Sequence, residues 1–181
     1  EEAYVTAVLL QVAQAVVSQN ELTDVLETVV HLMQILVSID TSVVYLWDPV
    51  NEYFYMAETL VESSHSPPDP QQTYALGEYP LLDMVYTNDS MAACLLDDPN
   101  LPVTRWNELE CMSPDERIDI MQPGDKHWVF GFPLSVKGEV FGAILVKETH
   151  SSPAMRDRRV EIINGIAQQI SLAIQNDRLR E

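Results

Sequence analysis

The fold is decided by residues 127–147, which read HWVFGFPLSVKGEVFGAILVK. In the first half, large apolar side chains recur at every second position, and this alternation is typical of a half-buried β-strand. Lys137 and Gly138 suit a tight two-residue turn, and the apolar run after Glu139 predicts a returning strand. The segment therefore predicts a β-hairpin. The side chains that share one face of its first strand are Trp128, Phe130, Phe132, Leu134 and Val136.

A second hairpin is predicted in the first third of the chain. Residues 41–48, TSVVYLWD, are rich in β-branched and aromatic side chains, which favour a buried strand. Residues 48–52 contain Pro49 and Asn51 and predict a turn. Residues 53–57, YFYMA, begin the partner strand. Two hairpins imply an antiparallel sheet.

Helices are predicted at both ends of the chain. Residues 3–18 and 22–36 each space their apolar side chains by three and four, which is typical of amphipathic helices. Asn20 is suited to cap the second of these helices. Ser152 and Pro153 provide an N-cap and a first helical residue for a closing helix, which continues to the end of the sequence.

The stretch between the two hairpins is the irregular part of the sequence. Residues 61–75 contain three prolines and predict an exposed loop. Residues 80–87 predict a short helix, residues 91–96 a short strand, and residues 97–126 one more short helix near 114–121. We expect an α+β fold in which the N- and C-terminal helices cover one face of the sheet. The irregular stretch would cover the other face and form a small-molecule pocket there.

The charge of the chain limits its partners. The net charge is -18 over 181 residues, and every Lys and Arg lies at Arg105 or later. An acidic surface repels phosphate backbones and anionic lipid headgroups, so we expect no nucleic-acid and no membrane partner. No apolar run approaches the roughly 20 residues of a membrane span, and the N-terminus lacks a secretory signal pattern. These features favour a cytoplasmic protein.

Four segments, taken in order, resemble the GAF domain family. They are LTDVLETVVHLMQILVSIDTSVVYLWD at 22–48, the region 77–98 with its MAACLLDD, GFPLSVKGEVFGAILV at 131–146, and INGIAQQISLAIQNDRL at 163–179. The resemblance implies an antiparallel sheet with a ligand pocket on one face, in a module of sensor kinases, phosphatases, cyclases or transcriptional regulators. It also implies that the terminal helices pair between subunits and transmit a signal.

This resemblance sets the expected domain organisation. We expect residues 1–181 to form a single GAF-type domain of a longer signalling protein. Residues 1–19 would form an N-terminal helix that serves as a linker or dimerisation element. Residues 20–181 would form the core with its C-terminal signalling helix. The expected partners are a small molecule and a second copy of the chain, bound through the terminal helices.

Covalent chromophores and cyclic nucleotides fit the sequence poorly. Photosensory relatives attach a bilin to a pocket cysteine, often with a nearby histidine, but neither Cys94 nor Cys111 has such a neighbour. The spacing of the two cysteines matches no known metal-binding motif. Whether they form a disulfide bond is left open. The residues linked to cyclic GMP include a lysine, and none precedes Lys126. Arg105 is the candidate for an anionic ligand group, with a plain surface arginine as the alternative.

The sequence gives little support for haem binding or for catalysis. None of the four histidines, at positions 31, 65, 127 and 150, has a context that demands a metal, so we expect no cofactor and no metal. The free methionine sulfoxide reductase of the GAF fold uses several pocket cysteines, a pattern that two unpatterned cysteines do not match. The sequence also lacks a nucleophile elbow, a phosphate loop and a His-Glu metal motif, so we expect no catalysis.

Aromatic residues are the best candidates for a binding site. If the aromatic faces of the predicted strands meet under the middle stretch, they line an apolar pocket with Tyr and Trp as polar groups. Ordinary core packing is the alternative, and the opposite strand face would bring in Val43, Phe54 and Met56 instead. The candidate ligand-binding residues are Tyr45, Trp47, Tyr55, Arg105, Trp106, Trp128 and Phe130.

The sequence therefore predicts a non-catalytic, small-molecule-sensing regulatory domain of a cytoplasmic signal-transduction protein. Ligand occupancy would shift the packing of the terminal helices. Two alternatives are a structural dimerisation module without a ligand and a haem-based gas or redox sensor. The identity of the ligand and the output domain of the parent protein are left open.

Overall fold

The computed structural model describes the backbone of residues 2–39, 41–60, 70–95, 104–105, 128–148 and 153–180. Within these ranges the helices are α1 (Glu2–Ser18), α2 (Leu22–Val37), α3 (Pro80–Asn88) and α6 (Pro153–Leu179). The strands are β1 (Ser42–Asp48), β2 (Tyr53–Leu60), β3 (Thr73–Ala75), β4 (Ala92–Leu95), β5 (Thr104–Arg105), β6 (Trp128–Val136) and β7 (Glu139–Glu148).

These strands form one antiparallel sheet in the order β3-β2-β1-β7-β6-β4-β5. Both predicted hairpins, β1–β2 and β6–β7, are confirmed. In the second, Val136 pairs with Glu139, and the two residues between them, Lys137 and Gly138, have φ angles of 51° and 84°. Positive φ at both central positions gives a turn whose twist matches that of the flanking strands. The Lys-Gly turn thus fixes the register of this hairpin.

The middle stretch is partly as predicted. The short helix and short strand are confirmed as α3 and β4. The expected loop over residues 61–75 is wrong at its end, because Thr73–Ala75 forms β3 and extends the sheet beyond β2. The helix expected near residues 114–121 lies outside the described residues.

The turn between α1 and α2 corrects a smaller prediction. Helix α2 begins at Leu22, with Glu21 rather than Asn20 as its N-cap, and Glu21 makes no side-chain capping bond. The carbonyl of Asn20 accepts a hydrogen bond from Arg180 Nη2 at 3.3 Å instead. The α1–α2 turn is therefore held by the end of α6.

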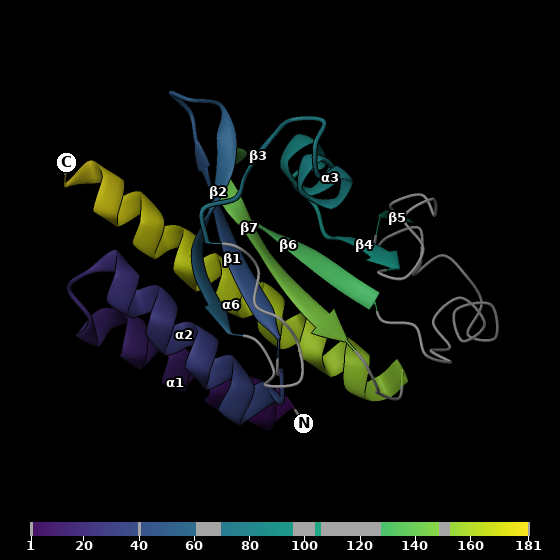
Figure 1. The fold of residues 1–181 in the computed structure, drawn as a ribbon. Helices are drawn as coiled ribbons and strands as arrows, with labels where there is room; N and C mark the ends of the chain where they lie inside the picture. The colour runs from purple at the N-terminus through teal and green to yellow at the C-terminus, as the bar shows by residue number, and fades with distance from the viewer. Residues whose placement is uncertain are drawn as a thin grey trace.

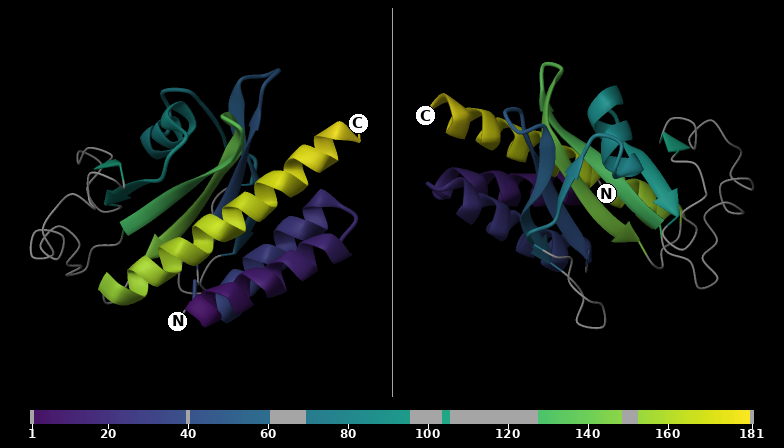
Figure 2. Two further views of the ribbon diagram at one scale, coloured as in Figure 1. Left: turned by 180° about the vertical axis from the view of Figure 1, so that it is seen from behind. Right: turned by 45° about the horizontal axis from the view of Figure 1, so that its top comes forward.

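The elements are arranged in layers around the sheet (Figure 1). Helices α2 and α6 pack on one face, and α1 packs against both of them, as the view from behind makes plain (Figure 2). Helix α3 packs on the opposite face. The expectation that the terminal helices share one face is confirmed, and this is the arrangement expected of an α+β fold.

Helices α1 and α6 run in the same direction. The carbonyl of Leu9 accepts a hydrogen bond from Gln169, and that of Asn20 from Arg180, so the same offset of 160 residues holds at both ends of the contact. The core on this side is continuous from α1 to the sheet. Its members include Val12 of α1, Val29 and Met33 of α2, Phe132 and Leu134 of β6, and Ile166 and Ile170 of α6.

Candidate functional site

The face of the sheet under α3 carries the candidate site, and strand alternation builds it. On β1, Tyr45 and Trp47 pack with α3, whereas Val44 and Leu46 pack with the terminal helices. Both aromatic side chains are buried, with exposed fractions of 4% and 7%. Strand β1 thus contributes to the cores on both faces of the sheet.

Helix α3 sits close to the sheet because β6 leaves room for it. A Cβ atom on Gly131 would lie 2.8 Å from Val85 Cγ2, closer than real side-chain contacts allow. Leu81, Leu82 and Val85 of α3 are fully buried against this surface. Pro80 at the start of the helix supplies a preset φ angle without losing a helical hydrogen bond. The apolar face of a short helix is therefore held tightly on β6 and β7.

Three aromatic rings pack against one another on the α3 face. Trp47 lies 4.7 Å from Phe54 and 4.8 Å from Tyr86, measured between ring centroids, and Phe54 and Tyr86 meet edge to face at 5.7 Å. Phe54 comes from β2, directly opposite Trp47, and Tyr86 from α3. Such pairs add about 0.5–1.5 kcal/mol each beyond area burial. This group ties α3 to the β1–β2 hairpin.

A second aromatic group is made of three tyrosines. The ring of Tyr45 lies 5.9 Å from that of Tyr74 and 6.2 Å from that of Tyr79, and the last two are 5.0 Å apart. All three contacts are edge to face. Burial, and to a lesser extent the neighbouring Tyr74, raises the pKa of Tyr45 to about 12. Tyr45 therefore keeps its proton at neutral pH and presents a hydrogen-bond donor on an apolar face.

Asp83 is the acidic side chain that α3 brings to this side. Its Oδ2 accepts a hydrogen bond from the backbone N–H of Gly77 at 2.9 Å, while its Oδ1 is buried and has no partner among the described residues. Burial chiefly raises its pKa, the negative charge of Glu78 adds to this, and the Gly77 bond opposes it. A buried acceptor without a partner is costly, so this oxygen is a place for a donor to bind.

The structure separates the aromatic residues that the sequence grouped. Tyr45 and Trp47 lie together on the α3 face. Phe130 is buried in the core of the terminal helices, and Tyr55, 38% exposed, pairs with Leu46 and so lies on that same side. Residues directly opposite in an antiparallel pair share a face, so the condition that all these aromatic faces meet is not fulfilled for Tyr55 and Phe130.

The alternative residue set fits the α3 face well. Val43, Phe54 and Met56 all belong to the cluster around Tyr45 and Trp47, and Val129, not Phe130, represents β6 there. The side chains of Arg105 and Trp128 and the whole of Trp106 lie outside the described residues, so their part in the site stays a prediction.

Sequence reasoning missed three tyrosines of the α3 face and one acid of α3. Tyr74 comes from β3, Tyr79 from the residue before α3, and Asp83 and Tyr86 from α3 itself. The sequence did signal a short helix here. It held no signal for the strand-to-helix pairing, because that contact joins segments about 40 residues apart.

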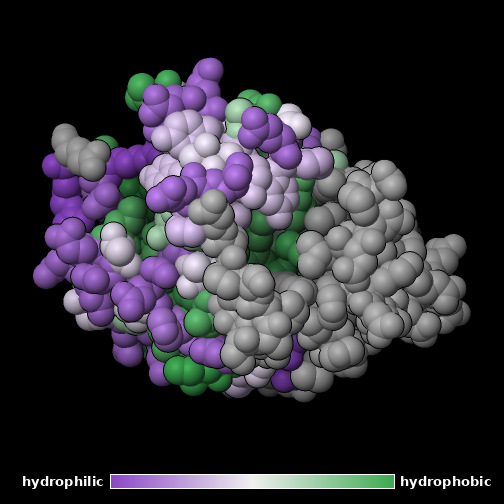
Figure 3. All heavy atoms as spheres, viewed as in Figure 1, coloured by the Kyte–Doolittle hydropathy of each residue, from purple (hydrophilic) through white to green (hydrophobic). Residues whose placement is uncertain are grey.

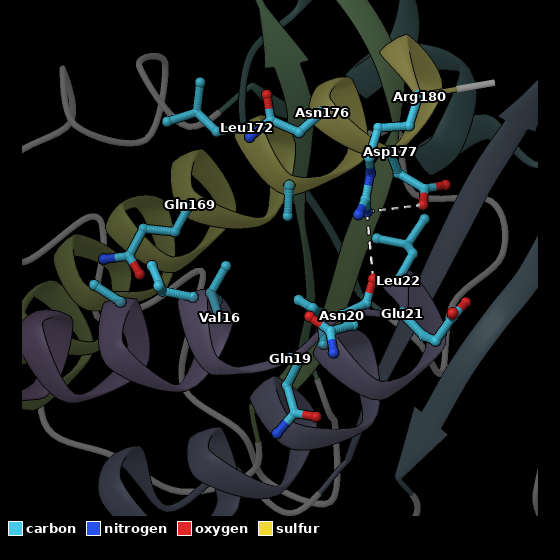
Figure 4. Close-up of a pocket in the computed structure, with 14 residues that line it drawn as sticks. Val16, Gln19, Asn20, Glu21, Leu22, Gln169, Leu172, Asn176, Asp177 and Arg180 are labelled. Atoms are coloured by element: carbon cyan, nitrogen blue, oxygen red, sulfur yellow. Dashed lines mark hydrogen bonds and ion pairs between the residues drawn. The ribbon is translucent and has the colours of Figure 1, made fainter.

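Two open grooves lie on the opposite side, along the terminal helices. The first, with a volume of about 570 Å³, lies between the α1–α2 turn and α6 (Figure 4). Val16, Val17 and Leu172 give it apolar walls, and Gln169 places a buried Oε1 there that has no partner among the described residues. The second, of about 560 Å³, lies between the β1–β2 turn and the end of α6.

The described residues form neither a metal-binding cluster nor a membrane-spanning helix. No group of three or more His, Cys, Asp or Glu side chains there could hold a metal ion. His31 is exposed on α2, where its Nδ1 lies 2.8 Å from the carbonyl of Glu27, and the other three histidines fall outside the described ranges. None of the described helices is long and apolar enough to cross a membrane.

The fold resembles solved structures at low sequence identity. The GAF domain of a phosphoenolpyruvate-protein phosphotransferase from Coxiella burnetii superposes with a TM-score of 0.69 at 17% identity, covering 98% of this chain and 96% of that one. The corresponding Acinetobacter domain gives 0.65 at 17% identity, with coverage of 96% and 94%. The free methionine-R-sulfoxide reductase of Neisseria meningitidis gives 0.63 at 13% identity, with coverage of 98% and 92%. At such identities the likeness shows the fold alone.

The sequence itself matches one family. No curated protein matches the chain. The family model of the GAF domain matches residues 21–174, which is most of the chain. GAF domains are in general sensory or regulatory modules of signalling proteins, and typically they are not catalytic. The chain belongs to the GAF domain family.

Proposed function

We propose that this domain senses a small molecule on its α3 face and passes ligand occupancy to the terminal helices without catalysing a reaction. One observation carries the proposal. Strand β1 packs Tyr45 and Trp47 under α3 and packs Val44 and Leu46 against the terminal helices. A ligand that moves β1 on one face therefore changes the packing on the other, because tightly packed interiors transmit displacement.

The α3 face supports a planar, largely apolar ligand with a few hydrogen-bonding groups. Apolar atoms are visible at the floor of a hollow on this face (Figure 3). On the same side of the sheet, Tyr45, Tyr74 and Tyr79 offer ring edges and hydroxyls, and Asp83 of α3 carries a buried acceptor. Sites of this kind bind mainly through apolar contact and use a few polar groups for orientation.

The proposal of binding without bond chemistry rests on residue types. The described α3 face presents phenols, an indole and aliphatic side chains, and the one carboxyl group of α3, Asp83, is held by the Gly77 N–H. A carboxyl group alone is a weak basis for catalysis, which needs a positioned partner. The reductase of Neisseria meningitidis shows that the fold can carry an enzyme, so residues and not fold decide the question.

The test is a melting-temperature screen of the purified chain against planar heterocycles such as indole, adenine and riboflavin. At a concentration of about 100 Kd, a bound compound should raise the melting temperature by roughly 5–10 °C. Tyr45→Phe, which removes only the hydroxyl, should reduce the shift, while Tyr53→Phe on the hairpin's other face should leave it unchanged. Absence of any shift, together with a bare mass in native mass spectrometry, would count against a sensor.

A second candidate function, dimerisation through the terminal helices, is favoured by the charge pattern. Residues 3–20 and 162–176 contain no charged side chain, although the chain carries a net charge of -18. Val17 and Leu172 are 84% and 53% exposed beside the groove shown in Figure 4. Two copies could meet on this uncharged surface without bringing acidic groups together. We propose a homodimer formed there, whether or not a ligand binds.

A further inference from the structure

Arg178, in the last turn of α6, is attached to the sheet by two contacts. Its Nη2 donates a hydrogen bond to the carbonyl of Trp47 at 3.2 Å. Its guanidinium carbon lies 4.8 Å from the ring centroid of Phe141, a buried side chain of β7. Cation–π contacts and charged hydrogen bonds are stronger when partly shielded from water, as this half-buried arginine is. The two contacts hold the end of α6 on the sheet.

The hydrogen bond reaches a residue that belongs to the opposite face. The side chain of Trp47 packs with Phe54 and Tyr86 under α3, while its carbonyl receives Arg178 from α6. The pairing of β1 with β7 ends at Leu46 and Gly142, one residue before Trp47. Trp47 is therefore the residue through which α3 and the end of α6 meet.

We propose that Arg178 is a positioning residue that couples the α3 face to the end of α6. The proposal rests on the proposed sensing function. When the Trp47 ring moves against Tyr86, its carbonyl moves with it, and the bond from Arg178 strengthens or breaks. Arg178 lines the groove of about 560 Å³ between the β1–β2 turn and α6. This groove gives the guanidinium space to move away from the Trp47 carbonyl and the Phe141 ring.

Two simpler roles for Arg178 must be separated from coupling. A cation in the last turn stabilises any helix through its dipole, and an arginine stem packs on apolar surface wherever it lies. Arg180 offers the matched control at the same helix end. It pairs with Asp177 at 3.5 Å and reaches the Asn20 carbonyl, and its side chain is 65% exposed. Its replacement removes the same charge without touching Trp47.

The test is a double-mutant cycle between Tyr86→Leu and Arg178→Met, read by amide hydrogen exchange over residues 170–179 of the whole chain. The two side chains lie on opposite faces of the sheet, so independent sites should give additive effects. Coupling predicts that either change alone lowers protection of this segment by roughly tenfold or more, as for one lost charged hydrogen bond. Coupling also predicts that the second change adds little once the first is made.

Three further variants serve as controls for the double-mutant cycle. Tyr86→Leu should keep its full effect in an Arg180→Met background. Tyr74→Leu, which disturbs the α3 face without contacting Trp47, should leave the exchange of 170–179 unchanged. Arg178→Lys keeps the charge but not the planar fork, so protection should stay low, and this variant replaces Arg178→Met in the cycle if the latter does not fold.

Additive effects in the cycle, or full rescue by Arg178→Lys, would overturn the coupling. The outcome is independent of the ligand screen. A chain that binds a compound but shows additive effects keeps its sensing function and loses this coupling. A chain that binds nothing but shows a non-additive cycle keeps the coupling and loses the proposed sensing function.

Discussion

At the scale of single residues, the α3 side of the sheet combines apolar side chains with two polar groups. Tyr45 keeps a protonated hydroxyl there, with its pKa raised to about 12. Asp83 holds one carboxylate oxygen on the Gly77 N–H and buries the other without a described partner. Structures seldom leave a buried acceptor such as Asp83 Oδ1 unpaired without a functional reason. We therefore propose this oxygen and the Tyr45 hydroxyl as the first candidates for contact with a ligand.

Asp83 gives a prediction for the pH dependence of stability. Because burial raises the pKa of Asp83 in the folded chain, the folded state binds its proton more tightly than the unfolded state does. The free energy of unfolding must then fall as pH rises through the window that starts near the ordinary aspartate value of about 4. Asp83→Asn removes this loss, so its stability relative to the parent chain should increase from pH 4 to pH 7.

Denaturant unfolding of both proteins at several pH values measures this difference. Asp24→Asn, at an exposed position of α2, provides the reference for the loss of one negative charge. The free energies of unfolding of Asp83→Asn and the parent are compared at each pH. If their difference stays constant or decreases with increasing pH, burial of the ionised Asp83 carboxylate does not destabilise the fold.

At the scale of elements, most of α1 and the middle of α6 form an uncharged surface, because residues 3–20 and 162–176 carry no charged side chain. They run parallel and close to each other, since a Cβ atom on Gly165 would lie 2.6 Å from Leu9 Cδ2. Their outer side chains include Leu10, Val17 and Leu172, all more than half exposed. An apolar, uncharged helix surface on an acidic protein is a typical protein-binding surface.

The proposed dimer is tested on this surface. Leu172→Glu should place a carboxylate at the centre of the contact and shift the chain to monomers, because each copy would bring a like charge. Sedimentation equilibrium over a wide concentration range measures the change. Val50→Glu, at an even more exposed apolar position on the β1–β2 turn, should leave the mass unchanged. A parent chain that is monomeric at all concentrations would rule out the homodimer.

The elements were largely predictable from sequence, and the site was not. Alternation and turn residues are local, so both hairpins and the terminal helices follow from neighbouring residues. Both faces of this sheet are buried, so alternation separates Tyr45 from Val44 but does not say which faces α3. For this reason the sequence did not show that Tyr55 and Phe130 lie on the other face from Tyr45 and Trp47. The contacts of Tyr74, Tyr79 and Tyr86 join distant segments.

At the scale of the whole molecule, one sheet separates a sensing face from a helical face. The α3 side gathers rings and two polar groups, and the other side gathers the two ends of the chain. Strand β1 and the contacts of Arg178 with Trp47 and Phe141 connect them. This arrangement fits a domain in which a small change under α3 alters where the terminal helices point.

Binding of a ligand under α3 is best tested by a ¹H–¹⁵N NMR titration. The compound that raises the melting temperature is added to the labelled chain, and the shifted amide signals are mapped onto the structure. We expect the largest shifts at Tyr45, Trp47 and Asp83, with smaller ones at Arg178. Shifts confined to residues of the groove between the α1–α2 turn and α6, such as Val17 and Leu172, would contradict it.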